Sequence, residues 1–329
     1  MEAQKSTQVP RLADSFGRMH NYLRISLIDS CNFTCTYCVS MQKPAKTKFS
    51  NLMSADEIET IAGMFVSMGV NKIRLTGGEP LLRHDFTAII HRLSKLPVHL
   101  TLTTNGYLLD QYMDDLSASG IDSLNMSLDT FQKEKFEKIA RFDGLEKVYS
   151  NLFALMKNNF HVKLNMVLMR GVNDDEINDF VEFSRKYPVH VRFIEYMPFT
   201  SNDWSKEKVY PAVELIEHIS SSYTIEKLPD AIHDTARKYR VDDAEGTFAI
   251  ISTVSEPFCS GCNRLRLTAD GKMRNCLFSK THNDLLTPFR KGEDIMPLIL
   301  ENLKGKFAEY GGQKMNNSIE NSNMILIGG

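Results

Sequence analysis

The six cysteines of the chain fall into two triplets that lie far apart, Cys31, Cys35 and Cys38 near one end and Cys259, Cys262 and Cys276 near the other. Three thiolates are one ligand short of a tetrahedral zinc site and of the four corners of an iron–sulfur cubane. Each triplet is therefore suited to hold a metal centre with one open position, at which another molecule can bind and react.

The first triplet has the spacing C-x3-C-x2-C, with the aromatic residues Phe33 and Tyr37 between its cysteines. One short loop with this spacing can cover three corners of a [4Fe-4S] cluster, and the pattern resembles the radical S-adenosylmethionine superfamily. The resemblance implies that the open iron binds S-adenosylmethionine, and that an electron from the cluster cleaves it to a deoxyadenosyl radical. The alternative is a zinc site or plain core cysteines. Zinc needs a fourth ligand, and the candidate His20 lies before the preceding strand.

A glycine-rich segment, Thr76-Gly77-Gly78-Glu79-Pro80, follows one strand later. By itself such a segment indicates a tight turn more often than a ligand site. After a cysteine loop, it resembles the superfamily segment whose backbone accommodates the methionine amino group. Gly78 is the best match to that role.

The second triplet has the spacing C-x2-C-x13-C, which is half of a zinc ribbon with one ligand missing. His282 could supply the fourth ligand, but its spacing is not typical of a metal site. Arg264 and Arg266 follow Cys262 closely and alternate with leucines, so both side chains lie on one face of a strand. Together with Arg274 they favour an anionic ligand beside this triplet. A solvated strand face is the alternative.

Alternating strand and helix segments must position these residues. Six short β-type runs are separated by amphipathic stretches, and they begin at Tyr22, Lys72, Val98, Ser123, Val162 and Val189. A helix between the first two runs is marked by the capping box Ser54–Glu57 and by Gly69 after its end. This pattern predicts an α/β fold whose parallel sheet closes into a full or partial barrel, with ligands at the carboxyl ends of the strands. The resemblance to the radical S-adenosylmethionine superfamily implies the partial form, a (βα)6 barrel.

The repeating pattern fades beyond residue 199. A helix is expected over 211–219 and strands over 247–254 and 264–268, followed by a polar tail that turns apolar at 324–327 and ends in Gly328-Gly329. We therefore divide the chain into an N-terminal arm (1–20), a radical S-adenosylmethionine barrel (21–205), and a C-terminal extension (206–329) that contains the second triplet and the Gly-Gly tail; the family resemblance described below implies that this extension carries a second cluster and binds substrate. The apolar tail either docks on the protein or frays.

Composition limits the function further. The chain has 329 residues, a net charge of −2 and a pI near 6.5, which argues against broad electrostatic binding to nucleic acid or to an anionic membrane. Residues 1–16 are polar, and no apolar run is long enough to span a bilayer, so we expect neither a signal peptide nor a membrane segment. We predict a cytoplasmic protein whose cysteines stay reduced and bind metal.

With both triplets located, the chain resembles the GTP 3′,8-cyclase family of molybdenum cofactor biosynthesis nearly from end to end. Besides the triplets, the resemblance rests on the order and spacing of several segments, namely Phe16-Gly17-Arg18, Leu23–Ser26, Arg74–Leu81, Thr103–Gly106, Asn125–Asp129, Gly171–Asp175, Arg192–Met197 and Gly328-Gly329. It implies a lyase with two [4Fe-4S] clusters that converts GTP to (8S)-3′,8-cyclo-7,8-dihydroguanosine 5′-triphosphate. The radical removes hydrogen from the ribose C3′, the carbon radical closes on C8, and the second cluster holds the guanine base.

The same resemblance implies roles for individual residues. The two triplets ligate the first and the second cluster, respectively. The residues implied to contact S-adenosylmethionine are Tyr37, Gly78, Ser127 and Met197. Those implied to contact GTP are Arg24, Arg74, Thr103, Lys163, Arg192, Arg264 and Arg266. The catalytic set combines the first triplet with Arg264, Arg266 and the terminal Gly328 and Gly329, which reach into the site as bare backbone.

The charges of the implied GTP contacts agree with an anionic substrate. All of them except Thr103 are cationic, and a triphosphate needs several donors in a chain without a net positive field. Arg24, Lys163 and Arg192 lie within strand runs, where a buried cation is costly unless it is paired. The alternative for these three is pairing with Asp or Glu inside the barrel.

The resemblance also implies partners. These are an external electron donor and a cyclic pyranopterin monophosphate synthase that receives the product, while the chain itself is a monomer or a homodimer. The nearest rival function is that of another two-cluster radical enzyme, such as a peptide-modifying maturase. A rival from a different class is a zinc-stabilised binding module.

The sequence departs from the family pattern beside the first triplet. Ser30 stands where an arginine is usual before the first cysteine, and Val39-Ser40 stands where Met-Pro usually follows the third. A lysine-rich loop at Lys43–Lys48 occupies a position where a glycine is common. These residues border the cluster rather than ligate it, so they bear on loop conformation and redox tuning rather than on the reaction.

Overall fold

The computed structural model describes residues 10–39, 47–200, 202–315, 319 and 323–328. Within these ranges, one sheet of twelve strands organises the chain, in the order β12-β11-β10-β1-β2-β3-β4-β5-β6-β9-β8-β7. The strands are β1 (Tyr22–Ser26), β2 (Lys72–Thr76), β3 (His99–Thr104), β4 (Ser123–Ser127), β5 (His161–Leu168), β6 (His190–Glu195), β7 (Ile225–Lys227), β8 (Arg237–Val241), β9 (Thr247–Ile251), β10 (Arg264–Leu267), β11 (Lys272–Arg274) and β12 (Asn283–Asp284).

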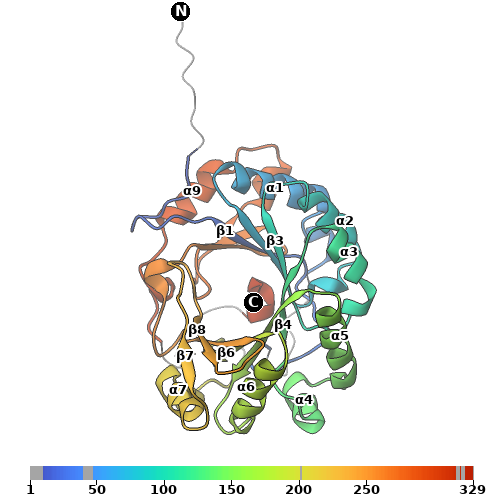
Figure 1. The fold of residues 1–329 in the computed structure, drawn as a ribbon. Coiled ribbons are helices and arrows are strands. Elements are labelled where there is room, and N and C mark those ends of the chain that lie inside the picture. Colours follow the sequence, from blue (N-terminus) through green and yellow to red (C-terminus); the bar gives the residue numbers. More distant parts are fainter. Residues whose placement is uncertain (1–9, 40–46, 201, 316–318, 320–322, 329) are drawn as a thin grey trace, which may run out of the picture.

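Strands β1 to β6 are neighbours in the sheet and run parallel, which confirms the predicted partial barrel. Figure 1 shows the sheet curving around an interior, with the helices outside it except for the C-terminal helix. The helices are α1 (Ala55–Ser67), α2 (Phe86–Leu93), α3 (Met113–Ala118), α4 (Lys133–Ala140), α5 (Leu145–Lys157), α6 (Ile177–Lys186), α7 (Ala212–Ser220), α8 (Leu286–Arg290), α9 (Met296–Lys304) and the C-terminal α10 (Met324–Ile327).

The C-terminal extension continues this sheet at both edges. Strand β10 pairs in parallel with β1, and β9 pairs in parallel with β6. The outermost strands β11, β12, β8 and β7 are antiparallel to their neighbours. The strands expected over 247–254 and 264–268 are present as β9 and β10, each somewhat shorter than expected. The sheet that surrounds the interior therefore contains strands from the barrel segment and from the C-terminal extension.

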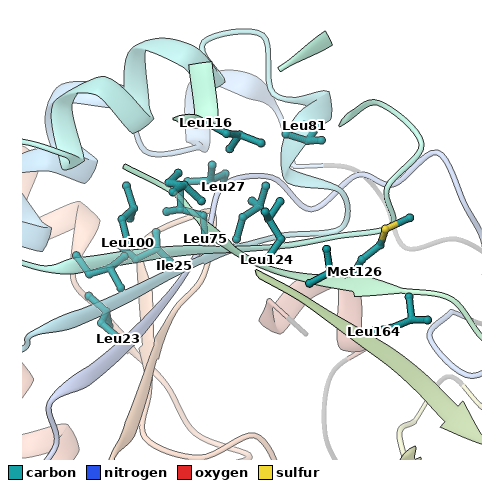
Figure 2. Packing of buried hydrophobic residues seen from close by; sticks show 14 of the residues in the cluster. Leu23, Ile25, Leu27, Leu75, Leu81, Leu100, Leu116, Leu124, Met126 and Leu164 are labelled. Atoms are coloured by element: carbon teal, nitrogen blue, oxygen red, sulfur yellow. The ribbon is translucent and has the colours of Figure 1, made fainter. Parts of the chain in front are cut away.

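The main core lies between the outer face of the sheet and the helices. Leu23 and Ile25 of β1 and Leu75 of β2 point into it and are fully buried, together with the residues shown in Figure 2. Successive side chains of a strand alternate between the two faces of the sheet. The polar residues that alternate with these apolar residues, such as Arg24 and Arg74, therefore point to the interior. The predicted capping box fixes the start of α1: Ser54 Oγ accepts from the Glu57 N–H at 3.2 Å, and the Glu57 carboxylate accepts from the Ser54 N–H at 2.7 Å.

The segment that precedes β1 packs against the extension. Leu12 is fully buried, and the Arg18 guanidinium donates to the carbonyl of Cys259 at 2.9 Å and to that of Ala308 at 2.7 Å. Arg18 thereby ties the N-terminal arm to the second cysteine triplet. In the described part of the chain, no helix is both long and apolar enough to cross a bilayer.

Candidate active site

The first cysteine triplet lies in the loop after β1, at the carboxyl end of the strand. The Cys38 N–H donates to the Cys35 carbonyl at 3.0 Å, and the charges of the three thiols interact. Burial, then the neighbouring Asp129 and the other thiols, raises the pKa of Cys35, and burial raises the pKa of Cys38 to about 12. Cysteine binds metal as the thiolate, so metal binding must displace these protons. Three soft donors on one loop fit a cluster held by three corners.

Two polar residues that follow strands contact this loop. Asn105, after β3, places its amide nitrogen Nδ2 3.8 Å from Cys31 Sγ. Asp129, after β4, accepts from Tyr37 Oη at 2.8 Å and from the Val167 N–H at 2.8 Å. Sequence reasoning selected neither residue, although it expected chemistry at the ends of these strands.

Gly78 lies against both the first cysteine loop and the C-terminal segment. Its N–H donates to the Ile28 carbonyl at 2.7 Å. A Cβ at this position would lie 2.3 Å from the Ser30 carbonyl oxygen and 2.9 Å from Ile325 Cγ1. Only glycine permits so close an approach, and any larger residue would push the cysteine loop away.

The inner face of the sheet carries predicted cations from several strands. Arg24 of β1 has Arg266 of β10 and Arg74 of β2 as its register partners. Lys163 of β5 and Arg192 of β6 come from the far side of the curved sheet, and their charges interact with that of Arg74. The structure thus brings these five residues around one interior.

Part of this cation set lacks matching anions. Arg192 Nε and Nη2 are buried and have no hydrogen-bond partner among the described residues. Burial and the charge of Arg74 lower the pKa of Arg192 to about 9, and burial with the charge of Arg192 lowers the pKa of Lys163 to about 8. No described carboxylate is among the charges that act on either residue, which removes the pairing alternative for these two. The interior is suited to bind a multiply charged anion.

Tyr22 and Lys72 belong to the same interior, although sequence reasoning did not select them. Tyr22 Oη accepts from Arg74 Nε. Burial alone would raise the pKa of Tyr22, but the charges of Arg74, Arg24 and Lys72 lower it to about 8. The strand alternation could have identified both residues, since Tyr22 and Arg24, like Lys72 and Arg74, are two positions apart.

The second cysteine triplet adjoins the cations of β10. The Cys262 N–H donates to the Cys259 carbonyl at 3.1 Å. Burial alone would raise the pKa of the Cys262 thiol, but the charges of Arg264 and Lys306 lower it to about 6. Arg266 interacts with the charges of Cys276 and Cys262. The Cys262 thiolate is therefore favoured, whereas burial raises the pKa of Cys259. The three thiols fit a metal centre beside an anion-binding surface.

The C-terminal segment α10 lies inside the curved sheet (Figure 1). Arg266 Nη1 donates to the Gly328 carbonyl at 2.8 Å, so the tail docks rather than frays. Gly328 has φ +68°, and a Cβ there would lie 2.7 Å from Thr76 Oγ1. The Ile325 N–H forms a hydrogen bond with the Cys38 thiol. Three residues of chain span at most about 11 Å, so the first triplet and Arg266 lie within reach of one small substrate.

The remaining predicted residues lie around the same interior. Ser127 is the last residue of β4, and Thr103 Oγ1 of β3 accepts from Arg74 Nη1 at 3.4 Å. Met197, after β6, packs against the apolar group that contains Ile327. Gly329 lies outside the described residues, as do Ser40 and most of the lysine-rich loop. Arg274 donates to the Ser279 carbonyl at 2.8 Å.

The histidines considered as zinc ligands have other neighbours. His20 is buried and its Nε2 lies 3.0 Å from Asp14 Oδ2, whereas His282 is exposed beside Lys272 and Arg274. Within the described ranges, no three His, Cys, Asp or Glu side chains are grouped so as to hold a single metal ion.

Comparison with known proteins defines the class of protein. Residues 25–184 match the model of the Radical SAM superfamily, and residues 189–311 match the model named Molybdenum Cofactor Synthesis C. The fold is similar to that of Streptococcus suis SuiB bound to S-adenosylmethionine, with a TM-score of 0.66 and 16% identity over 89% of this chain and 67% of that one. The chain is thus a radical S-adenosylmethionine enzyme by fold and by sequence.

Full-length similarity extends to proteins of known name. GTP 3′,8-cyclase, mitochondrial, from Arabidopsis thaliana is 42% identical over 325 residues, which cover 97% of this chain and 83% of the relative. GTP 3′,8-cyclase from Syntrophomonas wolfei is 38% identical, over 97% of this chain and 100% of the relative. Molybdenum cofactor biosynthesis protein 1 from Homo sapiens is 38% identical, and the chain spans only 51% of its length. The chain belongs to the GTP 3′,8-cyclase family.

Proposed function

We propose that this enzyme converts GTP to (8S)-3′,8-cyclo-7,8-dihydroguanosine 5′-triphosphate, the first step of molybdenum cofactor biosynthesis. The observation that carries the proposal is the buried set of cations between the two cysteine triplets. Among the described residues, two guanidinium nitrogens of Arg192 have no hydrogen-bond partner there. Arg266 interacts with the charges of the second triplet and donates to the Gly328 carbonyl. A triphosphate supplies the missing negative charge, which a neutral peptide segment does not.

The two cysteine triplets and the residues around Gly78 would have separate roles in this reaction. Cys31, Cys35 and Cys38 would hold one [4Fe-4S] cluster and Cys259, Cys262 and Cys276 a second; with S-adenosylmethionine bound, the first cluster supplies the radical chemistry that removes a hydrogen atom. Gly78, Tyr37, Ser127 and Met197 would form the S-adenosylmethionine site.

The inner face of the sheet would hold the substrate. Arg24, Arg74, Lys163 and Arg192 would bind the triphosphate and Thr103 a neighbouring oxygen, while Arg264 and Arg266 would orient the nucleotide toward the second triplet. Gly328, with Gly329 beyond it, would exclude water from the open side of the interior, since its backbone already contacts Arg266.

The decisive test uses reconstituted protein with GTP, S-adenosylmethionine and a strong reductant under anaerobic conditions. Mass spectrometry should detect deoxyadenosine together with an isomer of GTP. Deoxyadenosine with unaltered GTP would support the peptide-modifying rival. Zinc without iron or sulfide in anaerobically purified protein would refute both clusters and favour the binding module.

GTP affinity should fall as the pH rises from about 7 to about 9. Lys163, whose pKa is near 8 because of burial and the charges of Arg192, Arg74 and Lys72, loses its positive charge in this range. Tyr22, with a pKa also about 8, gains a negative charge and acts in the same direction. Calorimetric titration of GTP at several pH values should show proton uptake on binding above pH 8, because the bound anion restores the lysine charge.

A Lys163→Met variant should bind GTP less tightly at neutral pH and show a shallower pH dependence. The exposed Lys157 at the end of α5 gives a matched control, Lys157→Met. Stability has the opposite sign to affinity: charged Lys163 destabilises the ligand-free fold, and this cost is relieved as the pH rises from about 8 toward 10.5. An affinity that stays constant across this range would contradict the assigned role of Lys163.

The predicted electron donor, the hand-over to cyclic pyranopterin monophosphate synthase, the cytoplasmic location and a monomeric or dimeric state complete the proposal. The cytoplasmic location follows from the polar residues 1–16 and the lack of a long apolar run in the sequence, and the other three follow from the family resemblance.

A further inference from the structure

Lys306 is a buried lysine next to the second cysteine triplet. It lies two residues after the end of α9, and the residue is only 5% exposed. Its Nζ lies 3.8 Å from Cys262 Sγ and donates to the carbonyl of Asn275, the residue before Cys276. One ammonium group thus bridges two of the three cysteine segments.

No carboxylate among the described residues forms an ion pair with this lysine. Asp14, whose charge acts on His20 as that of Lys306 does, is already engaged, since its Oδ2 lies 2.6 Å from Arg18 Nε and 3.0 Å from His20 Nε2. The charges that act on Lys306 are those of Cys262 and Cys276 and of the cations Arg18 and Arg264. A buried ammonium is costly unless an anion faces it, and among the described residues the sulfurs of the second triplet are the groups that can supply that charge.

The anion that fits this position is the second triplet itself. We infer that Lys306 is the counter-ion of the second metal site, and that it donates a charge-assisted hydrogen bond to Cys262 sulfur when the triplet holds its cluster. This inference rests on the proposed second cluster. A cation at a cluster thiolate stabilises the more negative, reduced form and holds the thiolate in place. Lys306 is therefore a positioning residue that raises the reduction potential of the second cluster and slows its loss.

The test uses the full-length chain with the three substitutions Cys31→Ser, Cys35→Ser and Cys38→Ser. These remove the ligands of the first cluster, so that the second cluster can be measured alone. Within this background, Lys306→Met removes the charge at nearly constant size, and Lys306→Arg keeps a cation. Lys304→Met is the matched control, because Lys304 is exposed two residues away. Redox titration followed by electron paramagnetic resonance gives the potential, and iron release to a chelator gives the rate of cluster loss.

We expect Lys306→Met to lower the reduction potential and to release iron about tenfold faster, the usual scale for losing a group that supports a metal ligand. Lys306→Arg should recover most of both effects, and Lys304→Met should match the unmodified background. A Lys306→Met potential and release rate equal to those of Lys304→Met would overturn the inference. Equal acceleration of iron loss from both clusters, measured with the first triplet intact, would also overturn it, since that outcome indicates a general folding role.

Failure of the proposed function has a different signature. If the unmodified protein holds only about four iron atoms, all lost in the Cys31, Cys35, Cys38 background, the second cluster does not exist and the proposed function falls with it. If the unmodified protein holds about eight and Lys306→Met changes nothing, only the role of Lys306 is refuted.

Discussion

A Cys276→Ser variant is expected to keep the first cluster and to lose the cyclised GTP product by about 100-fold or more. Serine preserves the size of the side chain but replaces the soft thiolate that iron prefers. Cys276 is the sequence-distant member of its triplet, and the residue before it is fixed by a hydrogen bond from Asn275 Nδ2 to the Asn302 carbonyl at 2.6 Å. The substitution should therefore remove a ligand without moving the backbone.

The measurement is mass spectrometry of both products, together with iron and sulfide content. Iron should fall to that of one cluster, while a Cys38→Ser variant should lose deoxyadenosine as well. Ser260→Ala, at an exposed position between two cysteines of the second triplet, serves as the control and should behave like the wild type. Full production of the GTP isomer by Cys276→Ser would refute the role of the second triplet.

An Arg192→Met variant should bind GTP about 100-fold more weakly and yet be more stable without ligand, by about 1–3 kcal/mol. The guanidinium is buried beside Arg74 with two nitrogens unpartnered among the described residues, which is why the pKa of Arg192 is lowered to about 9. Methionine fills similar space without the desolvation cost. A substitution that raises the stability of the ligand-free protein and lowers its affinity for GTP indicates that the residue serves ligand binding rather than folding.

Denaturant unfolding and GTP titration, made on the same preparations, give the two quantities. The control is Arg240→Met on β8, because Arg240 is exposed and should contribute little to either quantity. A variant that loses both stability and affinity would show that Arg192 is a structural residue, and the anion site would then have to be reassigned.

Local patterns were sufficient to predict the strands that carry the site. The runs predicted to begin at Lys72 and Ser123 are present as β2 and β4, because the alternation of apolar and polar residues is a property of neighbouring residues. The same alternation indicated that Arg264 and Arg266 share a face. What this face meets, however, depends on a parallel pairing between β10 and β1, whose flanking residues Asn263 and Asn21 are 242 positions apart.

Residues that reach the site from loops were not predictable in this way. Lys304 and Lys306 have the same side chain and lie two positions apart, yet one is exposed and the other is buried against Cys262. Their difference arises only when the end of α9 meets the second triplet. Asn105 is a similar case, because its contact with Cys31 joins the ends of two strands and leaves no mark on the local sequence.

The strand order has a consequence for how the chain reaches this fold. Strands β1 and β6 are both interior strands of the sheet, since β10 and β9 cover them. A fragment ending near residue 205 would expose the backbone groups of both as open edges, which invite association with other chains. Pairing segments that are so distant is slow, because the closure of long loops precedes the gain in contacts. We therefore expect the unfinished barrel to be the aggregation-prone species of this protein until the C-terminal extension, which is made last, covers both edges.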